Sequence, residues 1–583
     1  MGWSSIIATW IRGRRSGICS SSPRPFRPSY GGTERIKPYL RAVPQREPLD
    51  HARGKPRHRI SIAGSTFFIM GATFASTLLG FMREVVSARY YGTRWEMDTF
   101  LAAATIPTIL FGVFNGALVS VLVPTFSEYL ANHEEDEAWR LASTTLNILA
   151  IVVTGCAIVG FFTARWYVPI IAHGFPAPQM GVAIRMTRWL MPSIVAVSLS
   201  GVLSAMLNAY HRFRSAALVG VAVNIVTIAC VVLLSHGMGI YALVVGTALG
   251  LTAQMLVQLP SFLSIGKYRP IIDLHHPGLK KIWVLLGPII VGSAAGQLAL
   301  FFDRFFASTL APGYIAGMNY ATKLVNFPQQ IFAAAIATVI FPLLAAQFAR
   351  ENRRGVARSV VTGLRLVNFI TIPSACALIV LSHPLVQALF ERGTFQAGAT
   401  DLTAGLLPYA AFGLVALGAN VVLTRCCFAC RETLWPVTIS VMTVVLNVLL
   451  SLVWLPGLGA RGLLLANSTS QTVQAVLLLM LTARLVSGID WGALVISIGK
   501  IAVCSLAMLA ALHWIGALGV TPEATLASRA WFLFGQIAIG GTVFIAFARM
   551  LDVEELDLAW HTIVAKFERN LVSPPENREA PIA

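Results

Sequence analysis

Long apolar stretches, each bounded by charged residues, proline or glycine, recur along most of the chain. Each covers about 20 residues, and a helix of that length, rising 1.5 Å per residue, crosses a hydrocarbon core of roughly 30 Å. The pattern predicts an all-α membrane protein with about fourteen spans. These lie near residues 60–82, 99–123, 141–164, 183–208, 216–235, 240–264, 283–305, 315–345, 362–382, 402–424, 435–455, 462–483, 492–514 and 529–548.

Composition agrees with a chain that is solvated by lipid. Hydrophobic residues make up 56 % of it and charged residues 12 %, against about 25 % charged in soluble domains. Residues 1–59 hold 13 Lys and Arg against 3 acidic residues, so they supply 13 − 3 = +10 of the net charge of +18. We expect a disordered cytoplasmic tail there, or a stretch upstream of the true start. A phosphate-binding arm is the alternative; no nucleic-acid partner is expected.

The basic connections predict the orientation. His211–Arg214, Lys267–Lys281 and Arg350–Arg358 fall on the same face as the basic tail once the spans are counted. Because the number of spans is even, both termini should lie on the cytoplasmic side. The membrane is expected to be the cytoplasmic (inner) membrane. The acidic run Glu134–Glu137 lies on this face too, but acidic residues weigh little in the rule.

The chain also repeats itself at an offset near 220 residues. Six predicted spans separate the repeats, and an even number keeps their direction, so the repeats are parallel. We expect a first six-helix lobe at 60–265, a second at 266–485, two further helices at 486–550 and a cytoplasmic tail at 551–583. This is typical of a transporter; the alternative is a duplicated scaffold that transports nothing. The matching positions are Phe81 and Phe301, Pro107 and Pro328, Pro124 and Pro342, Gly239 and Gly459, and Gln254 and Gln474.

Motifs of catalysis are absent from the sequence. Gly266-Lys267 and Gly499-Lys500 are followed by Tyr and Ile, so neither completes a Walker A loop, and H-E-x-x-H does not occur. The cysteines at 426, 427 and 430 have no second pair at zinc-ligand spacing. We therefore expect no enzyme, no metal site and no cofactor. The membrane potential and a coupling cation are the candidate energy sources.

Charged residues inside the predicted spans are the candidates for function. A charge at the centre of a span costs about 2.5–3.5 kcal/mol on insertion, so such residues usually face a polar cavity. A cationic cavity suits an anionic head group, because guanidinium forks bind phosphate with two hydrogen bonds. The alternative is that the arginines only reach to the membrane surface. The candidates are Arg83, Arg89 and Lys323 as cavity cations, Asp98 to hold one of them between substrates, and Glu84, Asp303, Arg304, Pro107 and Pro328 as lining or gating residues.

Several motifs, taken in order, resemble those of one family. Leu79-Gly-Phe-Met-Arg83, Ala88-Arg89 and Asp98-x-Phe100 are similar to the opening of the MurJ/MviN lipid II flippases. Asp303-x-x-Phe-Ala-Ser308 with Tyr320-Ala-x-Lys-Leu324 resembles the start of their second lobe, and Leu389–Phe395 resembles their most recognisable motif. The resemblance runs from about residue 60 to residue 550.

The resemblance implies a fourteen-span fold of the multidrug/oligosaccharidyl-lipid/polysaccharide exporter superfamily, with a cationic cavity. It implies that the substrate is lipid-linked peptidoglycan precursor, carried to the outer leaflet. We expect the chain to act as a monomer among membrane lipids. Arg83, Arg89 and Asp98 carry over by position, and Lys323 stands where the family has an arginine.

Some positions depart from the family's pattern. Thr77 and Phe111 stand where arginines are usual, and Thr105 replaces a lysine, so a less cationic cavity is expected. Another oligosaccharide linked to polyprenyl diphosphate, of the O-antigen or exopolysaccharide type, therefore remains an alternative cargo. Ser451, four residues after Asn447, replaces an acidic residue that some relatives use for sodium, which argues against ion coupling there.

Overall fold

The structure, a computed structural model, describes residues 62–517 and 525–558. They belong to one compact unit, Ile60–Ala583. These residues form helices and connections, and no strand occurs in the two ranges. The predicted tail at 1–59 and most of the predicted tail at 551–583 lie outside the described residues, and the predicted limits of the lobes stay predictions.

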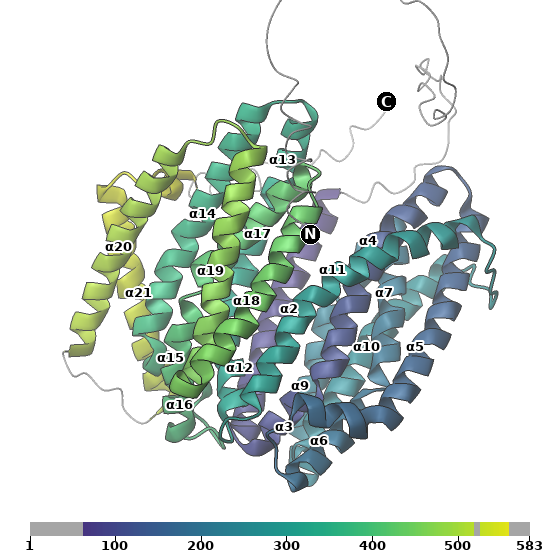
Figure 1. Cartoon of the computed structure of the whole chain (residues 1–583), viewed down its shortest axis with the longest axis horizontal. Helices are drawn as coiled ribbons and strands as arrows, with labels where there is room; N and C mark the ends of the chain where they lie inside the picture. Colours follow the sequence, from purple (N-terminus) through teal and green to yellow (C-terminus); the bar gives the residue numbers. More distant parts are fainter. Residues whose placement is uncertain (1–61, 518–524, 559–583) are drawn as a thin grey trace, which may run out of the picture. The chain divides into compact units, whose positions relative to one another are not determined.

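The helices gather into two bundles. In Figure 1 the first is coloured mainly purple to blue and the second mainly green. The first bundle holds α2 (Ile62–Tyr91), α3 (Trp95–Ala103), α4 (Thr105–Ala131), α5 (Glu135–Ile171), α6 (Ala177–Leu190), α7 (Ser193–Ala209), α8 (Phe213–Ala217), α9 (Val219–Met238) and α10 (Tyr241–Ile265).

The second bundle has an equivalent plan. It holds α11 (Pro277–Ala307), α12 (Tyr314–Pro328), the π-helix η1 (Gln329–Ala333), α13 (Ala334–Ala349), α14 (Arg353–Val380), α15 (Ser382–Phe390), α16 (Ala397–Ala411), α17 (Leu414–Ala429), α18 (Leu434–Leu458) and α19 (Ala460–Leu485). The last two helices, α20 (Trp491–Ala517) and α21 (Leu526–Met550), pack on each other, with α20 against α14.

Membrane-spanning character is confirmed, but the number of spans is not. Within the described ranges, eleven helices are long and apolar enough to cross a membrane, or twelve if α16 and α17, bent by 43° at their break, form one span. The predicted spans at 283–305 and 315–345 coincide with α11 and with α12–η1–α13, which are not among the twelve. The count of fourteen therefore stays a prediction.

The predicted repeat is visible in the backbone. Helix α9 is capped by Gly239 and α18 is capped by Gly459, 220 residues later, and both glycines have φ 56° and ψ −135°. That left-handed region favours glycine. Helix α9 packs against α10 and α2, as α18 packs against α19 and α11. The same turn and the same neighbours recur in each lobe.

Helix α11 belongs to neither lobe alone. It packs against α4 and α5 of the first lobe and against α18 and α19 of the second. Figure 1 shows it running obliquely from one bundle to the other. It is the continuous helical connection between the lobes.

The connections define two faces of the molecule. We call the face with the connections 132–134, 210–212, 266–276 and 350–352 the basic face, and the face with 92–94, 172–176, 308–313 and 391–396 the opposite face. One buried apolar core joins the lobes toward the opposite face, where Tyr91 and Phe100 of the first lobe belong to the same cluster as Tyr320, Phe390 and Phe395 of the second. Toward the basic face each lobe has a core of its own. The lobes are thus joined at one face and separate at the other.

The segment after α21 is fixed to the bundle by an ion pair. Arg365 of α14 donates to Glu555 and, at 2.9 Å, to Glu554, and Ser497 of α20 donates to Glu555 at 2.5 Å. Burial raises the pKa of the Glu555 carboxyl, but the hydrogen bonds from Arg365 and Ser497 lower it by more. Its pKa therefore lies below the ordinary value, and the carboxylate is the bound form.

This lowered pKa predicts a pH-dependent contribution to stability. The Glu555 contact should stabilise the fold fully above the ordinary pKa of about 4.5, and the stabilisation should disappear as pH falls through the lower folded-state pKa. The difference in melting temperature between wild type and Glu555→Gln should be constant from about pH 7 to pH 5 and shrink below that. Glu554→Gln, whose side chain is 79 % exposed, should change little at any pH. A difference that grows on acidification would contradict the assignment.

Candidate substrate cavity between the lobes

Two adjoining cavities of about 460 and 470 Å³ lie between the lobes, and a third of about 270 Å³ is lined by α11 and the second lobe. Lys323 of α12 lines all three, and Arg83 and Glu84 of α2 line the two larger ones. The cavity of about 460 Å³ reaches toward the basic face, where Val219 and Gly220 at the start of α9 form part of its wall. Toward the opposite face, the shared core closes the space.

Glu84 is the centre of the charge network in this cavity. Its Oε1 lies 2.9 Å from Nη2 of Arg83 and 3.8 Å from Nζ of Lys323, and its Oε2 accepts from Asn319 at 3.4 Å. Glu84 is buried, whereas the side chains of Arg83 and Lys323 remain 29 % and 42 % exposed. The two cations thus come from different lobes, meet at one carboxylate and still present part of their surface to the cavity.

Arg304 of α11 adds a third cation to the same wall. Its guanidinium donates to the side-chain oxygen of Asn319 and to the backbone oxygen of Ile315, each at 3.5 Å. Arg304 and Lys323 both line the cavities of about 470 and 270 Å³. With Arg83, three positive side chains face one carboxylate in the cavity of about 470 Å³, 3 − 1 = +2.

The structure corrects the expectation for Asp98. This residue was expected to hold a cavity cation, but its carboxylate accepts from the backbone N–H of Gly313 at 2.5 Å and of Ala316 at 2.7 Å. No cation lies within ion-pair distance of it among the described residues. The N–H groups of the first helical turn are free, and the positive end of the helix dipole favours a carboxylate. Asp98 of α3 therefore caps α12 across the lobe boundary.

Arg89 also lies away from the cavity. It is exposed in the last turn of α2, and it is its backbone oxygen that meets the second lobe, accepting from the N–H of Thr394 at 2.9 Å and from its hydroxyl at 3.0 Å. Arg89 follows Arg83 by six residues, which places it about 9 Å further along the helix and on another side of it. The expectation that both arginines form one cavity is wrong for this conformation.

Glycines permit the close contact between the lobes at the opposite face. Gly313 has φ +96°, and a Cβ there would lie 2.4 Å from the backbone oxygen of Thr93. Gly92 has φ +59°, its own Cβ would lie 2.7 Å from the oxygen of Thr394, and its backbone oxygen accepts from the hydroxyl of Tyr320. Asp98 and these glycines form the part of the interface that we call the closed gate.

Gly313→Ala and Gly239→Ala should separate backbone strain from gate contact. Both glycines have positive φ, but a Cβ at Gly239 meets nothing within 4 Å. Gly239→Ala should cost about 1–3 kcal/mol of stability, because residues with a Cβ rarely adopt φ 56° with ψ −135°. Gly313→Ala should have this cost and also push the lobes apart at the gate. Spin-label distances across the gate should lengthen for Gly313→Ala alone; equal distances in the two variants would contradict the role of this contact.

The remaining predicted residues have mixed placements. Asp303 accepts from the amide of Asn447 at 3.4 Å and lines the smallest cavity. Pro107 lines the cavity of about 470 Å³. Its ring leaves the backbone oxygen of Ala103 without a helical hydrogen bond. That oxygen accepts from the hydroxyl of Thr187 at 3.2 Å instead of lining the substrate path. Pro328 ends α12 directly before the π-helix η1, where the regular hydrogen-bond ladder changes.

Several cavity residues escaped the sequence analysis. Asn319, which links Glu84 to Arg304, lies one helical turn before Lys323 on the same face, and this spacing could have identified it. Ser200 and Ser204 of α7 line the cavity with Gln254 of α10, and their spacing of four in an apolar helix was a similar signal. Three positions that depart from the family's pattern do face the cavities: Thr77, Thr105 and Phe111.

Two repeated lobes with a cationic cavity between them, joined at one face of a membrane-spanning fold, define a two-lobe membrane transporter. The fold is shared with a solved structure of a MATE family transporter of the MOP superfamily in an inward-facing conformation, at TM-score 0.64 and 15 % identity over 72 % of this chain and 98 % of that one. The family model described as Lipid II flippase MurJ matches residues 87–532. The chain belongs to the MurJ family of lipid II flippases.

Individual relatives agree with this assignment. The chain is 29 % identical to a probable lipid II flippase MurJ of Vibrio cholerae, over 85 % of this chain and 97 % of the relative. It is 30 % identical to one from Rhizobium meliloti, over 82 % and 92 %. A solved structure of lipid II flippase MurJ in an inward closed conformation matches at TM-score 0.72 and 25 % identity, covering 83 % of this chain and 98 % of that one.

Proposed function

We propose that this chain is a flippase that moves lipid II, the polyprenyl-diphosphate-linked precursor of peptidoglycan, from the inner to the outer leaflet of the cytoplasmic membrane. The observation that supports this most is the meeting of Arg83 and Lys323, from different lobes, at the single buried carboxylate of Glu84. Membership of the MurJ family supports the choice of lipid II as substrate.

In the proposed orientation the basic face is cytoplasmic, and both termini lie on that side. The cavity then receives its substrate from the cytoplasm, since the closed gate lies at the opposite face. We propose that one chain acts alone among membrane lipids, as a transporter that makes and breaks no covalent bond and binds no nucleic acid.

The proposed role of the charge network is to exchange partners. Moving a glycan diphosphate through hydrocarbon would strip hydrogen bonds from many polar groups, at several kcal/mol each. Arg83 and Lys323 would transfer part of their interaction from Glu84 to the diphosphate, each charge-assisted hydrogen bond contributing about 1.5–3 kcal/mol. Because the cations belong to different lobes, the bound diphosphate draws the lobes together and favours closure at the basic face.

The membrane potential is the proposed driving force. Two phosphate charges moving outward across an inside-negative potential gain roughly 2.3 kcal/mol each per 100 mV, or about 5 kcal/mol together. This proposal needs no bound cofactor, and a coupling cation would only add to the gain. Asp303, which lines the smallest cavity with Asn447 beside it, is a carboxylate that such a cation could use.

Flipping of fluorescent lipid II in proteoliposomes tests the proposal. Wild type should carry the label from the inner to the outer leaflet and so expose it to an external enzyme, and this exposure should be faster when an inside-negative diffusion potential is imposed. Arg83→Ala and Lys323→Ala should each slow flipping at least tenfold, equivalent to about 1.4 kcal/mol. Lys323→Arg should retain activity, because it keeps the charge. Arg185→Ala, an exposed arginine of α6 paired only with the hydroxyl of Tyr241 in the described part of the chain, is the control.

The outcomes separate the rival readings. Flipping that does not depend on the potential would refute the proposed driving force. Transport of an O-antigen-type or exopolysaccharide polyprenyl diphosphate but not of lipid II would move the assignment to another cargo. No transport of either by the folded protein would favour a scaffold.

A further inference from the structure

Residues 266–276, which connect α10 to α11 on the basic face, lie along α5 as a bound segment that we call the strap. Its backbone is held by polar side chains of α5 at three places, so it does not extend freely into solvent. The hydrogen bonds run from Arg269 N to Ser143 Oγ at 3.2 Å, from Asp273 N to Thr144 Oγ1 at 3.2 Å, and from Asn147 Nδ2 to the Ile271 oxygen at 3.0 Å.

The strap lies at the depth of the lipid head groups. Helix α5 has 37 residues, so at 1.5 Å per residue it is far longer than the hydrocarbon core of roughly 30 Å. Its exposed Trp166 is an interfacial anchor toward the opposite face. Asn147 precedes Trp166 by 166 − 147 = 19 residues, or about 28 Å. Asn147 therefore marks the other edge of the hydrocarbon, and the strap bonded to it lies at that edge.

The outer surface of the strap is apolar at this edge. Ile271, Ile272 and Leu274 are 36 %, 48 % and 68 % exposed. Exposed isoleucine and leucine next to one another on a segment of eleven residues are costly in water but not beside acyl chains. These side chains suit the boundary between head groups and hydrocarbon.

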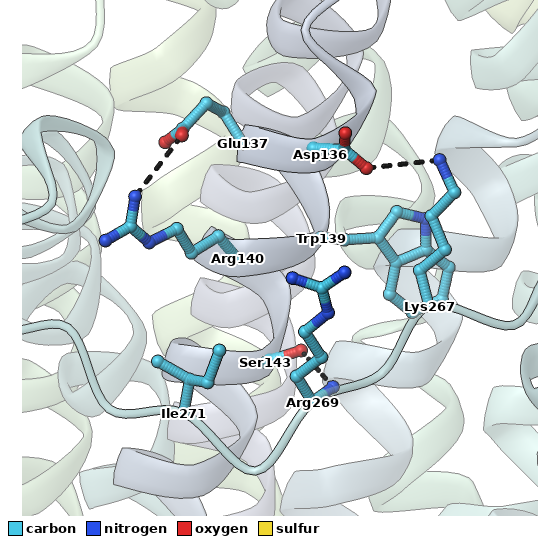
Figure 2. Close-up of a pocket in the computed structure, with 8 residues that line it drawn as sticks. All are labelled: Asp136, Glu137, Trp139, Arg140, Ser143, Lys267, Arg269 and Ile271. Atoms are coloured by element: carbon cyan, nitrogen blue, oxygen red, sulfur yellow. Dashed lines mark hydrogen bonds and ion pairs between the residues drawn. The ribbon is translucent and has the colours of Figure 1, made fainter.

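An unpaired guanidinium lies directly outside this apolar edge. Figure 2 shows the pocket of about 350 Å³ at the start of α5, in which Asp136 is bound by Lys267 at 3.1 Å and Glu137 by Arg140 at 3.4 Å. The side chain of Arg269 extends between these two pairs and has no ion partner among the described residues. Its backbone is bound one helical turn, about 6 Å, further out than Asn147.

We propose that the strap binds an anionic phospholipid of the leaflet at the basic face, with the lipid phosphate on Arg269 and an acyl chain along Ile271 and Ile272. Lys267 is shared by Glu135 and Asp136, and Arg140 is shared by Glu137 and Asp273, whereas Arg269 has no carboxylate partner among the described residues, so its guanidinium is the cation left for a ligand. A guanidinium fork matches a phosphate with two hydrogen bonds. The adjoining apolar side chains select a lipid over a free phosphate ion. This site is separate from the cavity between the lobes.

Lipid titration of the purified full-length protein tests the site. Thermal stability in detergent would be followed while dioleoylphosphatidylglycerol or dioleoylphosphatidylcholine is added. Wild type should be stabilised by the anionic lipid at lower concentration than by the zwitterionic one. Arg269→Ala should need about tenfold more anionic lipid, a change of about 1.4 kcal/mol. The control is Arg354→Ala, an exposed arginine at the start of α14 on the same face, which should leave the titration unchanged.

Two results would overturn the proposal. One is an unchanged titration for Arg269→Ala, and the other is stabilisation of wild type by inorganic phosphate alone at millimolar concentration, which would indicate a free-anion site. A second variant guards against misfolding of the first: tryptophan fluorescence of Ile272→Trp should be quenched by phosphatidylglycerol with brominated acyl chains. The reference is Asp490→Trp on the α19–α20 connection, which should be quenched less; equal quenching would place the strap outside the hydrocarbon edge.

Discussion

Replacing Glu84 by alanine is expected to abolish flipping and to lower the melting temperature more than any other single change in the cavity. The substitution leaves Arg83, Lys323 and Arg304 facing one another in a site of low dielectric without their shared carboxylate. Breaking a buried ion pair by removing one partner costs about 3–5 kcal/mol. Thermal unfolding and the proteoliposome assay would measure both effects.

The matched control is Glu128→Ala, which removes the carboxylate of a surface pair with Lys281. Its side chain is 56 % exposed, so the loss should be below about 1 kcal/mol and flipping should continue. Equal destabilisation by the two substitutions would mean that Glu84 does not balance the cavity cations. Wild-type flipping by Glu84→Ala would remove the charge network from the mechanism.

Asp98→Ala is expected to open the gate at the opposite face. The carboxylate is 2 % exposed and accepts from the backbone N–H groups of Gly313 and Ala316, so its removal leaves two donors of α12 unpaired in the protein interior. A hydrogen bond to a charged group contributes about 1.5–3 kcal/mol. Loss of both should move the equilibrium between closed and open gates by about 100-fold or more.

Labelling of a cysteine at Ala104 would measure that shift. Ala104 lines the cavity, so a membrane-impermeant maleimide added on the side of the opposite face reaches it only when the gate is open. The native cysteines would be replaced by alanine in this background. Asp98→Ala should label about 100-fold faster than the parent. Thr99→Ala, a neighbouring buried residue whose hydroxyl bonds only within the first lobe in the described ranges, should label at the parent's rate.

The fold was predictable because its signals are repeated and long. Apolar runs identify spans without knowledge of their neighbours, and the offset of 220 residues between Gly239 and Gly459 is a property of the sequence that the identical turns confirm. Helix ends were less predictable. Helix α5 begins at Glu135 and not near residue 141, because ion pairs to Lys267 stabilise polar turns that no hydropathy argument would include.

The residues that line the cavity were predictable only where their charge and their position on a helix face determine where they lie. Arg83 and Lys323 were expected to meet across the repeat axis, and they do so through Glu84. The destination of Asp98 was not available from the sequence, because a carboxylate satisfies a cation and a helix N-terminus equally well. Which of the two it meets depends on how the lobes pack at the gate, a long-range property.

Helix α11 determines how the lobes can move. Its first part is packed on α4 and α5 and its last part on α18 and α19. The strap before it is itself bonded to α5, so no slack chain is available between the bundles. Any rotation of one lobe relative to the other must therefore bend this helix or change its packing against one of the lobes.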